Sequence, residues 1–492
     1  VVYLEPLALA LSARAAQPVK MIMTRDEIMR ASGPTSGANM IIKIGATKEG
    51  KLTAGKALLN YQAGAFAGSP VGPGTMCAFA PYDMENVQAI GYDVVTNRPK
   101  VAAYRAPGAP ISEYAVESVI DEIALEIGMD PVELRLKNAA KEGTRAAYGP
   151  KFGPVGLVET LEATRDSDHY KKPLGKYQGR GVASGFWFNI GGETCVSLNV
   201  NEDGTVNVLS GTPDIGGGRA SLAMMVADEL GIEYEKVRPI IADTASLGFT
   251  FLTGGSRATF SNGLAAVEAA ENAKMDLRGR AAKYWEIPIE AVEWEDGMAK
   301  PAGSNAGEFD PLSLADLAKL APKTGGPIAG HAQINAQGAA PSFGTHLVDV
   351  EVDPETGQVE ILRYTVVQDA GKAIHPSYVE GQFQGGAVQG IGWALNEEYV
   401  YGKDGRLQNT GFLDYRIPVA SDVPMIDTVI VEVPNPSHPY GVRGIGETPI
   451  IPPMAAIANA VSQALDIRFT ELPMSPPKVL AAIDAANGAG DD

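Results

Sequence analysis

The chain has 492 residues, two cysteines, and 59 acidic against 40 basic side chains, which gives a formal charge of −19. This length allows two or more domains, and a content of 45% hydrophobic and 20% charged residues excludes a wholly disordered protein. The acidic balance argues against nucleic acid or an anionic membrane surface as a partner. The two cysteines are too few for an iron–sulfur cluster, and they fit a reducing compartment, so we expect a cytoplasmic protein.

The first residues contain no initiator methionine, no basic segment and no cleavage pattern, so they do not form a signal peptide. An apolar helical pattern starts at once, over 5–16, which is typical of sequence inside a domain. We therefore expect that residues upstream of Val1 are missing from the chain. No apolar run is long enough for a transmembrane helix.

Local patterns predict an α+β fold. Alternating or β-branched runs on either side of a glycine-containing turn predict three β-hairpins, which are 41–47 with 51–62, 194–200 with 205–210, and 346–352 with 358–368. Helical periodicity covers 111–127, 131–138, 157–165, 220–230, 263–284, 312–321, 450–465 and 477–486. Because strands and helices do not alternate regularly, a doubly wound sheet is disfavoured.

Composition indicates where the domains divide. The segment 143–179 is rich in glycine, lysine and proline and is the best candidate boundary. We expect one domain over 1–150, a larger domain over 175–486, and a disordered acidic tail over 487–492. The glycine- and proline-rich stretch 300–330 is expected to be a long surface excursion.

Five glycine-containing loops next to helical patterns are the main candidates for ligand binding, and they cover 103–110, 212–219, 253–260, 382–393 and 440–449. Amides at helix N-termini and in glycine turns bind anions, so five such loops could together hold one large phosphate-bearing ligand. Each loop also has an ordinary explanation. These explanations are a turn with a surface arginine at Arg105, a flexible turn at the three successive glycines, N-capping by Ser261 or Asn262, and close helix packing around Gln389.

Glu447 stands alone between the fifth loop and an apolar helix. If it is buried, its carboxyl pKa is raised and suits a general base; if it is exposed, it merely interacts favourably with the helix dipole. The five histidines show no metal-ligand spacing, and neither cysteine belongs to a C-x-x-C motif. A metal ligated by the protein and a cysteine nucleophile are both disfavoured.

The five loops, taken in order, resemble the molybdopterin-binding large subunit of the xanthine dehydrogenase/aldehyde oxidase family of molybdenum hydroxylases. The motifs that carry the resemblance are AYRAPGAP at 103–110, DIGGG at 214–218, GGSRATF at 254–260, DAGKAIHPSYVEGQFQGGAVQGIG at 369–392 and GIGETPIIPP at 444–453. The resemblance implies two molybdenum-cofactor-binding domains of mixed sheets and helices, with the cofactor between them. It also implies molybdenum held by a pterin dithiolene, in the cytosine dinucleotide form, with no direct protein ligand. Iron–sulfur clusters and FAD would be carried by partner subunits.

Roles for individual residues follow from the same resemblance. Glu447 matches the catalytic glutamate, which would deprotonate a hydroxide on molybdenum before oxygen attacks an electron-poor carbon and hydride passes to a sulfido ligand. The matching cofactor-binding positions are Arg105, Ala106, Gly108, Gly216, Gly217, Gly218, Ser256, Arg257, Ala258, Thr259, Gln389 and Gly446. Phe186, Trp187 and Phe188 are candidates for a substrate pocket because aromatic faces stack flat rings, and core packing explains them equally well.

The chain departs from the family pattern in three places. Gly217 stands where many members have glutamine, so one hydrogen bond near the metal is missing or replaced. The family's G-G-F-G-G-K element is absent, so the first domain is expected to be incomplete, with the missing part on another polypeptide or truncated. The loop at Arg105 lacks the cysteine of aerobic carbon monoxide dehydrogenases, which disfavours that reaction.

We therefore expect an oxidoreductase that hydroxylates an N-heteroaromatic ring or an aldehyde carbon of a small molecule. Its oxygen would come from water, and its electrons would pass to iron–sulfur and FAD subunits. One alternative is the reductive dehydroxylation of an aromatic thioester on the same cofactor. Another is a non-catalytic fragment that keeps the fold without the metal.

Overall fold

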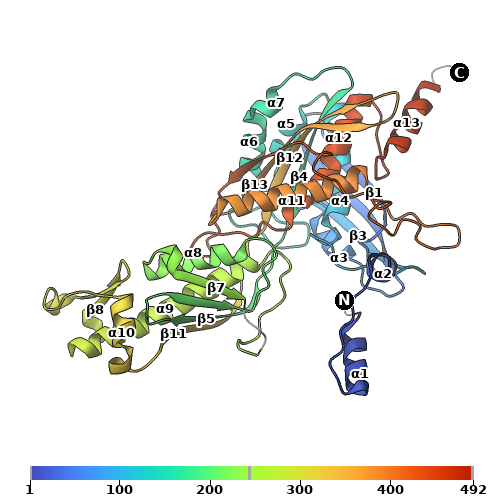
Figure 1. Cartoon of the computed structure of the whole chain (residues 1–492). Coiled ribbons are helices and arrows are strands. Elements are labelled where there is room, and N and C mark those ends of the chain that lie inside the picture. Colours follow the sequence, from blue (N-terminus) through green and yellow to red (C-terminus); the bar gives the residue numbers. More distant parts are fainter. Residues whose placement is uncertain (1–2, 242–244, 489–492) are drawn as a thin grey trace.

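The computed structural model describes residues 3–241 and 245–488, in which four sheets are covered by helices (Figure 1). The sheet of the N-terminal part and the sheet that contains residues 178–187 and 342–369 lie together. Residues 192–336, green to yellow in Figure 1, form a lobe that extends away from these two sheets. Strands pair in both parallel and antiparallel directions, so the predicted α+β class is confirmed. None of the described helices is both long and apolar enough to cross a membrane.

The first sheet belongs to the N-terminal part of the chain. It has the order β1-β2-β3, with β1 (Ala38–Ala46), β2 (Leu52–Gly64) and β3 (Asn86–Val95). The predicted hairpin is confirmed, because β1 and β2 pair antiparallel. Helices α3 (Val71–Cys77) and α4 (Ala109–Glu126) pack against this sheet, and α4 contributes Val116, Ile120 and Ala124 to the core between them.

The second sheet joins strands that are far apart in the sequence. Its order is β14-β13-β12-β4, with β4 (Gln178–Trp187), β12 (Ser342–Val352), β13 (Val359–Asp369) and β14 (Ile426–Val431). Helix α12 (Pro453–Leu465) packs on β4 and β12. The approach is so close that a Cβ at Gly181 would lie 1.8 Å from the Ala456 carbonyl oxygen, so only glycine fits there.

The lobe is built on the third sheet, of order β11-β5-β6-β7. Its strands are β5 (Gly192–Val200), β6 (Val206–Ser210), β7 (Val237–Ile241) and β11 (Ile328–Ala336). Helices α8 (Gly218–Leu230) and α9 (Ala258–Trp285) pack against it through alanine and aliphatic side chains. At the far end is a small sheet of β8 (Val292–Glu295), β9 (Met298–Pro301) and β10 (Leu312–Ser313), followed by α10 (Leu314–Thr324). The expected surface excursion over 300–330 was therefore wrong, since strands and a helix occupy much of it.

The remaining helices complete the fold. They are α1 (Glu5–Ala15), α2 (Arg25–Ala31), α5 (Pro131–Asn138), α6 (Leu157–Asp166), α7 (Asp168–Lys171), α11 (Pro376–Leu395) and α13 (Pro476–Gly488). Short 3-10 turns lie at η1 (Tyr234–Lys236), η2 (Ile289–Ala291), η3 (Gly303–Asn305) and η4 (Thr448–Ile450). Because α13 continues to Gly488, the predicted tail begins too early, and its last four residues, 489–492, lie outside the described residues.

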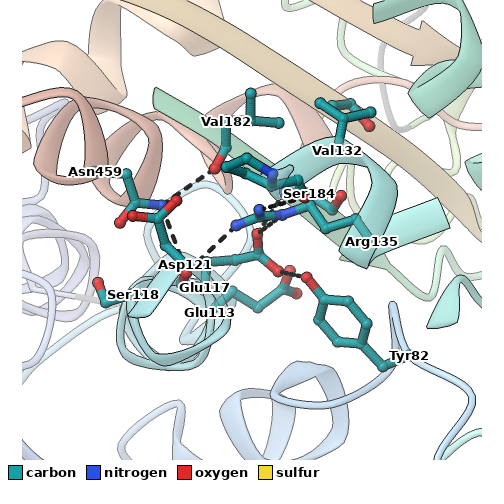
Figure 2. A network of polar contacts seen from close by, with 12 residues as sticks. Tyr82, Glu113, Glu117, Ser118, Asp121, Val132, Arg135, Val182, Ser184 and Asn459 are labelled. Carbon is teal, nitrogen blue, oxygen red and sulfur yellow. Dashed lines mark hydrogen bonds and ion pairs between the residues drawn. The ribbon is translucent and has the colours of Figure 1, made fainter. Parts of the chain in front are cut away.

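A buried polar network joins α4 to the free edge of β4 (Figure 2). The Glu117 carboxylate accepts hydrogen bonds from the Ser184 amide at 2.9 Å and from Arg135 Nε at 2.9 Å, and also from the Tyr82 hydroxyl. One turn earlier, Glu113 accepts the Phe186 amide at 3.2 Å. These carboxylates take the place of a neighbouring strand, so β4 has a satisfied edge without one.

Candidate cofactor-binding site

A cavity of about 740 Å³ lies where the five glycine-containing loops meet. Each loop contributes to its lining, and one representative of each is Arg105, Gly216, Ser256, Gln389 and Glu447. The loops come from different parts of the fold, because 214–218 and 253–257 belong to the lobe and the other three do not. The cavity therefore lies between the lobe and the remainder of the molecule.

Arg105 links three of the five loops. Its guanidinium donates to Gln389 Oε1 at 3.0 Å, to Gln382 Oε1 at 3.0 Å, and to the Gly446 carbonyl. Burial lowers the Arg105 pKa to about 10, which leaves the side chain charged at neutral pH. The surface arginine considered from the sequence is thus a partly buried hub of the site.

Glu447 points into the same cavity and is partly buried. Its Oε2 accepts the Ser256 hydroxyl at 2.7 Å, and its Oε1 accepts the Ala106 amide at 3.3 Å. Burial raises the pKa of the Glu447 carboxyl, and these hydrogen bonds together with the charge of Arg105 offset part of that rise. This environment is the one expected for a general base and not for an exposed helix-start acid.

The three-glycine loop has fewer free amides than its composition suggests. Asp214 Oδ1 accepts the amides of Gly216 at 3.0 Å and Gly218 at 3.1 Å, so only part of the predicted anion nest remains. Gly217 lies in the left-handed region with φ +92°, and a Cβ there would come within 2.5 Å of the Tyr378 ring. It lines a small adjoining cavity of about 50 Å³ and not the main one.

The third loop begins a helix without a side-chain cap. Helix α9 starts at Ala258, so Ser261 and Asn262 lie inside it. Neither residue is the N-cap, and the alternative explanation of this loop by N-capping was wrong. Ala258 and Thr259 line the cavity at this helix start. The Arg257 side chain is fully buried, so it anchors the loop, and only the Arg257 backbone remains free for a cofactor.

The aromatic trio divides between the cavity and the core. Trp187 and Phe188 line the cavity, with ring centroids 4.3 Å apart. Phe186 was wrongly assigned to the pocket: alternation along β4 turns it to the opposite face, where it packs against Phe152 at 5.6 Å and Phe343 at 5.1 Å. Core packing therefore accounts for Phe186, whereas Trp187, which is 2% exposed, belongs both to the core and to the cavity lining.

Two predicted cofactor positions shape the site from outside its lining. Gly108 has φ +87°, and a Cβ there would lie 2.1 Å from the Pro70 carbonyl oxygen, so it sets the path of the first loop. Ala106 also has a positive φ, +52°, and directs its amide to Glu447. Both residues act through the backbone.

Gln382 also belongs to the site, although it was not predicted from the sequence. Its side chain accepts from Arg105 and lines the cavity beside Gln389. The signal was available, because residues seven apart on a helix share a face, and Gln382 precedes Gln389 by that spacing. Among the described residues, no group of three or more histidine, cysteine, aspartate or glutamate side chains is arranged to hold a metal ion.

Two segments of the chain match families of molybdopterin cofactor-binding domains. Profiles of the molybdopterin cofactor-binding domain match residues 1–139 and 158–424. The fold and the site thus define a molybdopterin cofactor-binding protein. The chain belongs to the xanthine dehydrogenase/aldehyde oxidase family, as one of its molybdopterin-binding subunits.

Three curated relatives illustrate the similarity. The xanthine dehydrogenase molybdenum-binding subunit of Escherichia coli O157:H7 is 34% identical over 78% of this chain and 54% of its own length. The nicotine 6-hydroxylase large subunit of Paenarthrobacter nicotinovorans is 30% identical over 94% and 62%. The aldehyde oxidoreductase of Megalodesulfovibrio gigas is 29% identical over 98% and 53%. The chain spans between 53% and 62% of the length of these relatives.

Solved structures agree on the fold. Quinoline 2-oxidoreductase from Pseudomonas putida 86 has a TM-score of 0.87 at 25% identity, covering 97% of this chain and 66% of its own. CO dehydrogenase from Oligotropha carboxidovorans has a TM-score of 0.88 at 22% identity, covering 99% and 66%. At that identity the second likeness concerns the fold alone.

Proposed function

We propose that this chain is the molybdenum-cofactor subunit of an oxidoreductase that hydroxylates an N-heteroaromatic ring or an aldehyde carbon, with oxygen taken from water. The observation that carries the proposal is Glu447, a carboxylate of raised pKa that faces the cavity where the motif loops meet. The assembly of all five loops around one cavity supports an enzyme over a non-catalytic fragment.

The residues present fit a large, polar, anionic cofactor. The cavity offers the charged guanidinium of Arg105, the side-chain amides of Gln382 and Gln389, and the amide-bearing start of α9. Such groups would hold a pterin and its phosphates, and the glycine turns support the cytosine dinucleotide form. When bound, the molybdenum group supplies a Lewis-acidic redox centre that accepts electrons from the substrate.

The chain's own contribution to the reaction is proton transfer and positioning. Glu447 accepts the proton of the water that becomes the new oxygen, and its raised pKa places it closer to neutrality than an ordinary glutamate. Trp187 and Phe188 offer aromatic faces against which a flat substrate ring stacks. Pro107 and Phe251 supply further apolar lining that excludes water.

Partner subunits carry the remaining electron-transfer groups in this proposal. Two relatives are named as a large subunit and as subunit gamma of a complex, which indicates assembly from several chains. Cys77 and Cys195 are both buried, and neither forms a disulfide. We therefore assign the iron–sulfur clusters and FAD to separate subunits.

Replacement of Glu447 by glutamine tests the proposal. The variant keeps the size and the hydrogen-bonding acceptor of the side chain but cannot accept a proton at neutral pH. We expect turnover of the complete complex to fall by about 10²–10⁴-fold, while the molybdenum content is unchanged. Glu397→Gln is the matched control, since Glu397 is also partly buried with a raised pKa but lies outside the cavity lining. Full activity of Glu447→Gln would exclude Glu447 as the base.

A further inference from the structure

The Ser256 hydroxyl donates a short hydrogen bond to Glu447. Its Oγ lies 2.7 Å from Glu447 Oε2, whereas the Ala106 amide is 3.3 Å from Oε1. Ser256 and Glu447 are 191 positions apart and belong to different parts of the fold. Of these two donors, only the one at Ser256 is a side chain, so it alone can be removed by substitution.

The loop that carries Ser256 is fixed on both sides. The neighbouring Arg257 is fully buried and donates to the Gly191 carbonyl at 2.7 Å and to Thr194 Oγ1 at 2.6 Å. On the other side, Gly444 lies so close that a Cβ would be 2.0 Å from the Ser256 carbonyl oxygen. These contacts on both sides fix the position of the loop, and with it the position of the Ser256 hydroxyl.

Ser256 also has a backbone conformation that serine rarely adopts. Its φ is +58°, in the left-handed region that is costly for residues with a Cβ. Strain of this kind persists where the surrounding structure enforces it, and it concentrates at functional sites. Here it aims the hydroxyl at the carboxylate.

The other charged and titratable groups around Glu447 do not replace this contact. Arg105 gives its hydrogen bonds to Gln389, Gln382 and the Gly446 carbonyl. Cys77, at the end of α3, has a pKa raised by burial and by the charges of Glu113 and Glu447, so it stays a neutral thiol. The orientation of the Glu447 carboxylate therefore depends on Ser256 and on backbone amides.

We propose that Ser256 is the positioning residue of Glu447, with its hydroxyl holding one carboxylate oxygen so that the group stays directed into the cavity. This assignment rests on the proposed function and goes beyond it, because the resemblance placed Ser256 only among the residues that contact the cofactor. The side chain serves the base, and the backbone of the same loop remains free to serve the cofactor.

The test compares Ser256→Ala, Ser256→Gly and Ser261→Ala in the complete complex. Alanine is tolerated at positive φ in this same site, as Ala106 shows, and glycine relieves the strain altogether. Ser261 is the control, because it is a fully buried serine of α9 with no hydrogen-bond partner for its hydroxyl. The molybdenum content of each variant reports on the integrity of the site.

Two measurements follow the carboxylate itself. Loss of a donor to the ionised form raises the pKa of Glu447, so the acidic limb of the pH profile of kcat/KM should move upward by roughly one to two pH units in both Ser256 variants. Infrared difference spectra, with the Glu447 band identified by its loss in Glu447→Gln, should show the same shift in the absence of turnover. Ser261→Ala should show neither change.

The outcomes separate this inference from the proposed function. Unchanged titration of the Glu447 band in both Ser256 variants would overturn the positioning role, even if activity were lost. A shifted band in a complex whose Glu447→Gln variant remains active would support the contact and reject Glu447 as the base. A purely structural role of Ser256 predicts lower molybdenum content without any movement of the band.

Discussion

Gly217 occupies a position where a side chain has no room. The position lies at φ +92°, and any Cβ would meet the Tyr378 ring at 2.5 Å. Tyr378 is itself held by stacking on His375, with ring centroids 4.0 Å apart. A side chain at this position, such as the glutamine that the family resemblance led us to expect, would therefore collide with this aromatic pair.

We predict that Gly217→Gln destabilises the protein by roughly 2 kcal/mol or more, from left-handed strain and from the collision with Tyr378. Adding Tyr378→Ala should recover the part of the loss that the collision causes, since the two residues are in contact. Chemical unfolding of the two single variants and the double variant measures this coupling. Strictly additive effects would contradict the proposed collision.

The sequence indicated which loops meet at the cavity better than it indicated the direction of the individual side chains. The motif loops were located from glycine content, and Glu447 from its isolation between a loop and an apolar helix. The direction of a side chain was harder to derive, because it is fixed by partners that are distant in the sequence. Phe186 packs into the core on that account, and Arg257 is used for anchoring.

At the scale of elements, α4 and β4 are joined by two glutamates in different environments. Glu113 is fully buried, and its pKa is raised by burial first and by the charge of Glu117 second. Glu117 is paired with Arg135 at 2.9 Å, and both side chains are buried. The two residues lie one turn apart on the same face of α4 (Figure 2).

We predict opposite effects for the two glutamine variants. The folded state favours the protonated form of Glu113, because burial raises its pKa, so its contribution to stability falls as pH rises above the ordinary glutamate pKa. Glu113→Gln should therefore gain in unfolding free energy relative to the natural protein as pH increases. Glu117→Gln should lose about 3–5 kcal/mol, since it leaves Arg135 as an unpaired buried charge. Chemical unfolding across a pH series measures the unfolding free energy of both variants. The same stability and the same pH dependence in the two variants would contradict this prediction.

The elements themselves were largely predictable, since they depend on local pattern. The three hairpins and the predicted helical segments are found within a few residues, because alternation and helical periodicity record which face is buried. The pairing of β4 with β12 was not predictable, as no local signal joins Ser184 to Thr345 across the whole lobe. The second predicted domain, 175–486, accordingly contains three of the four sheets.

At the scale of the whole molecule, the lobe of 192–336 is inserted between two paired strands and returns two loops to the cavity. The site is therefore completed only when the lobe is docked on the remainder of the chain. This arrangement explains why five weak motifs, spread over 103–449, are needed together. It also means that conditions which loosen the fold should reduce cofactor retention.

Acid should loosen the fold through buried histidines. Burial lowers the pKa of His346 to about 3 and that of His438 to about 4, so both stay neutral in the folded state. The unfolded chain takes up these protons below the ordinary histidine pKa, so stability is lost as pH falls from there toward the lowered values. The loss is about 1.4 kcal/mol per histidine for each pH unit.

We predict that His346→Gln flattens the decline of unfolding free energy between neutral and mildly acidic pH. His331→Gln, at an exposed position, controls for the replacement of a histidine as such. Unfolding midpoints across this pH range give the two slopes. A slope for His346→Gln that matches the natural protein would show that His346 does not contribute to acid sensitivity.

The central claim is that the five loops hold a molybdenum–pterin cofactor beside Glu447. The most direct test is the joint determination of molybdenum and released pterin nucleotide in the purified complete complex. We expect both to be equimolar with this chain, to be retained in Glu447→Gln, and to fall together in Arg105→Ala, which removes the hub of the site. A complete complex that contains neither molybdenum nor a pterin nucleotide would contradict the account.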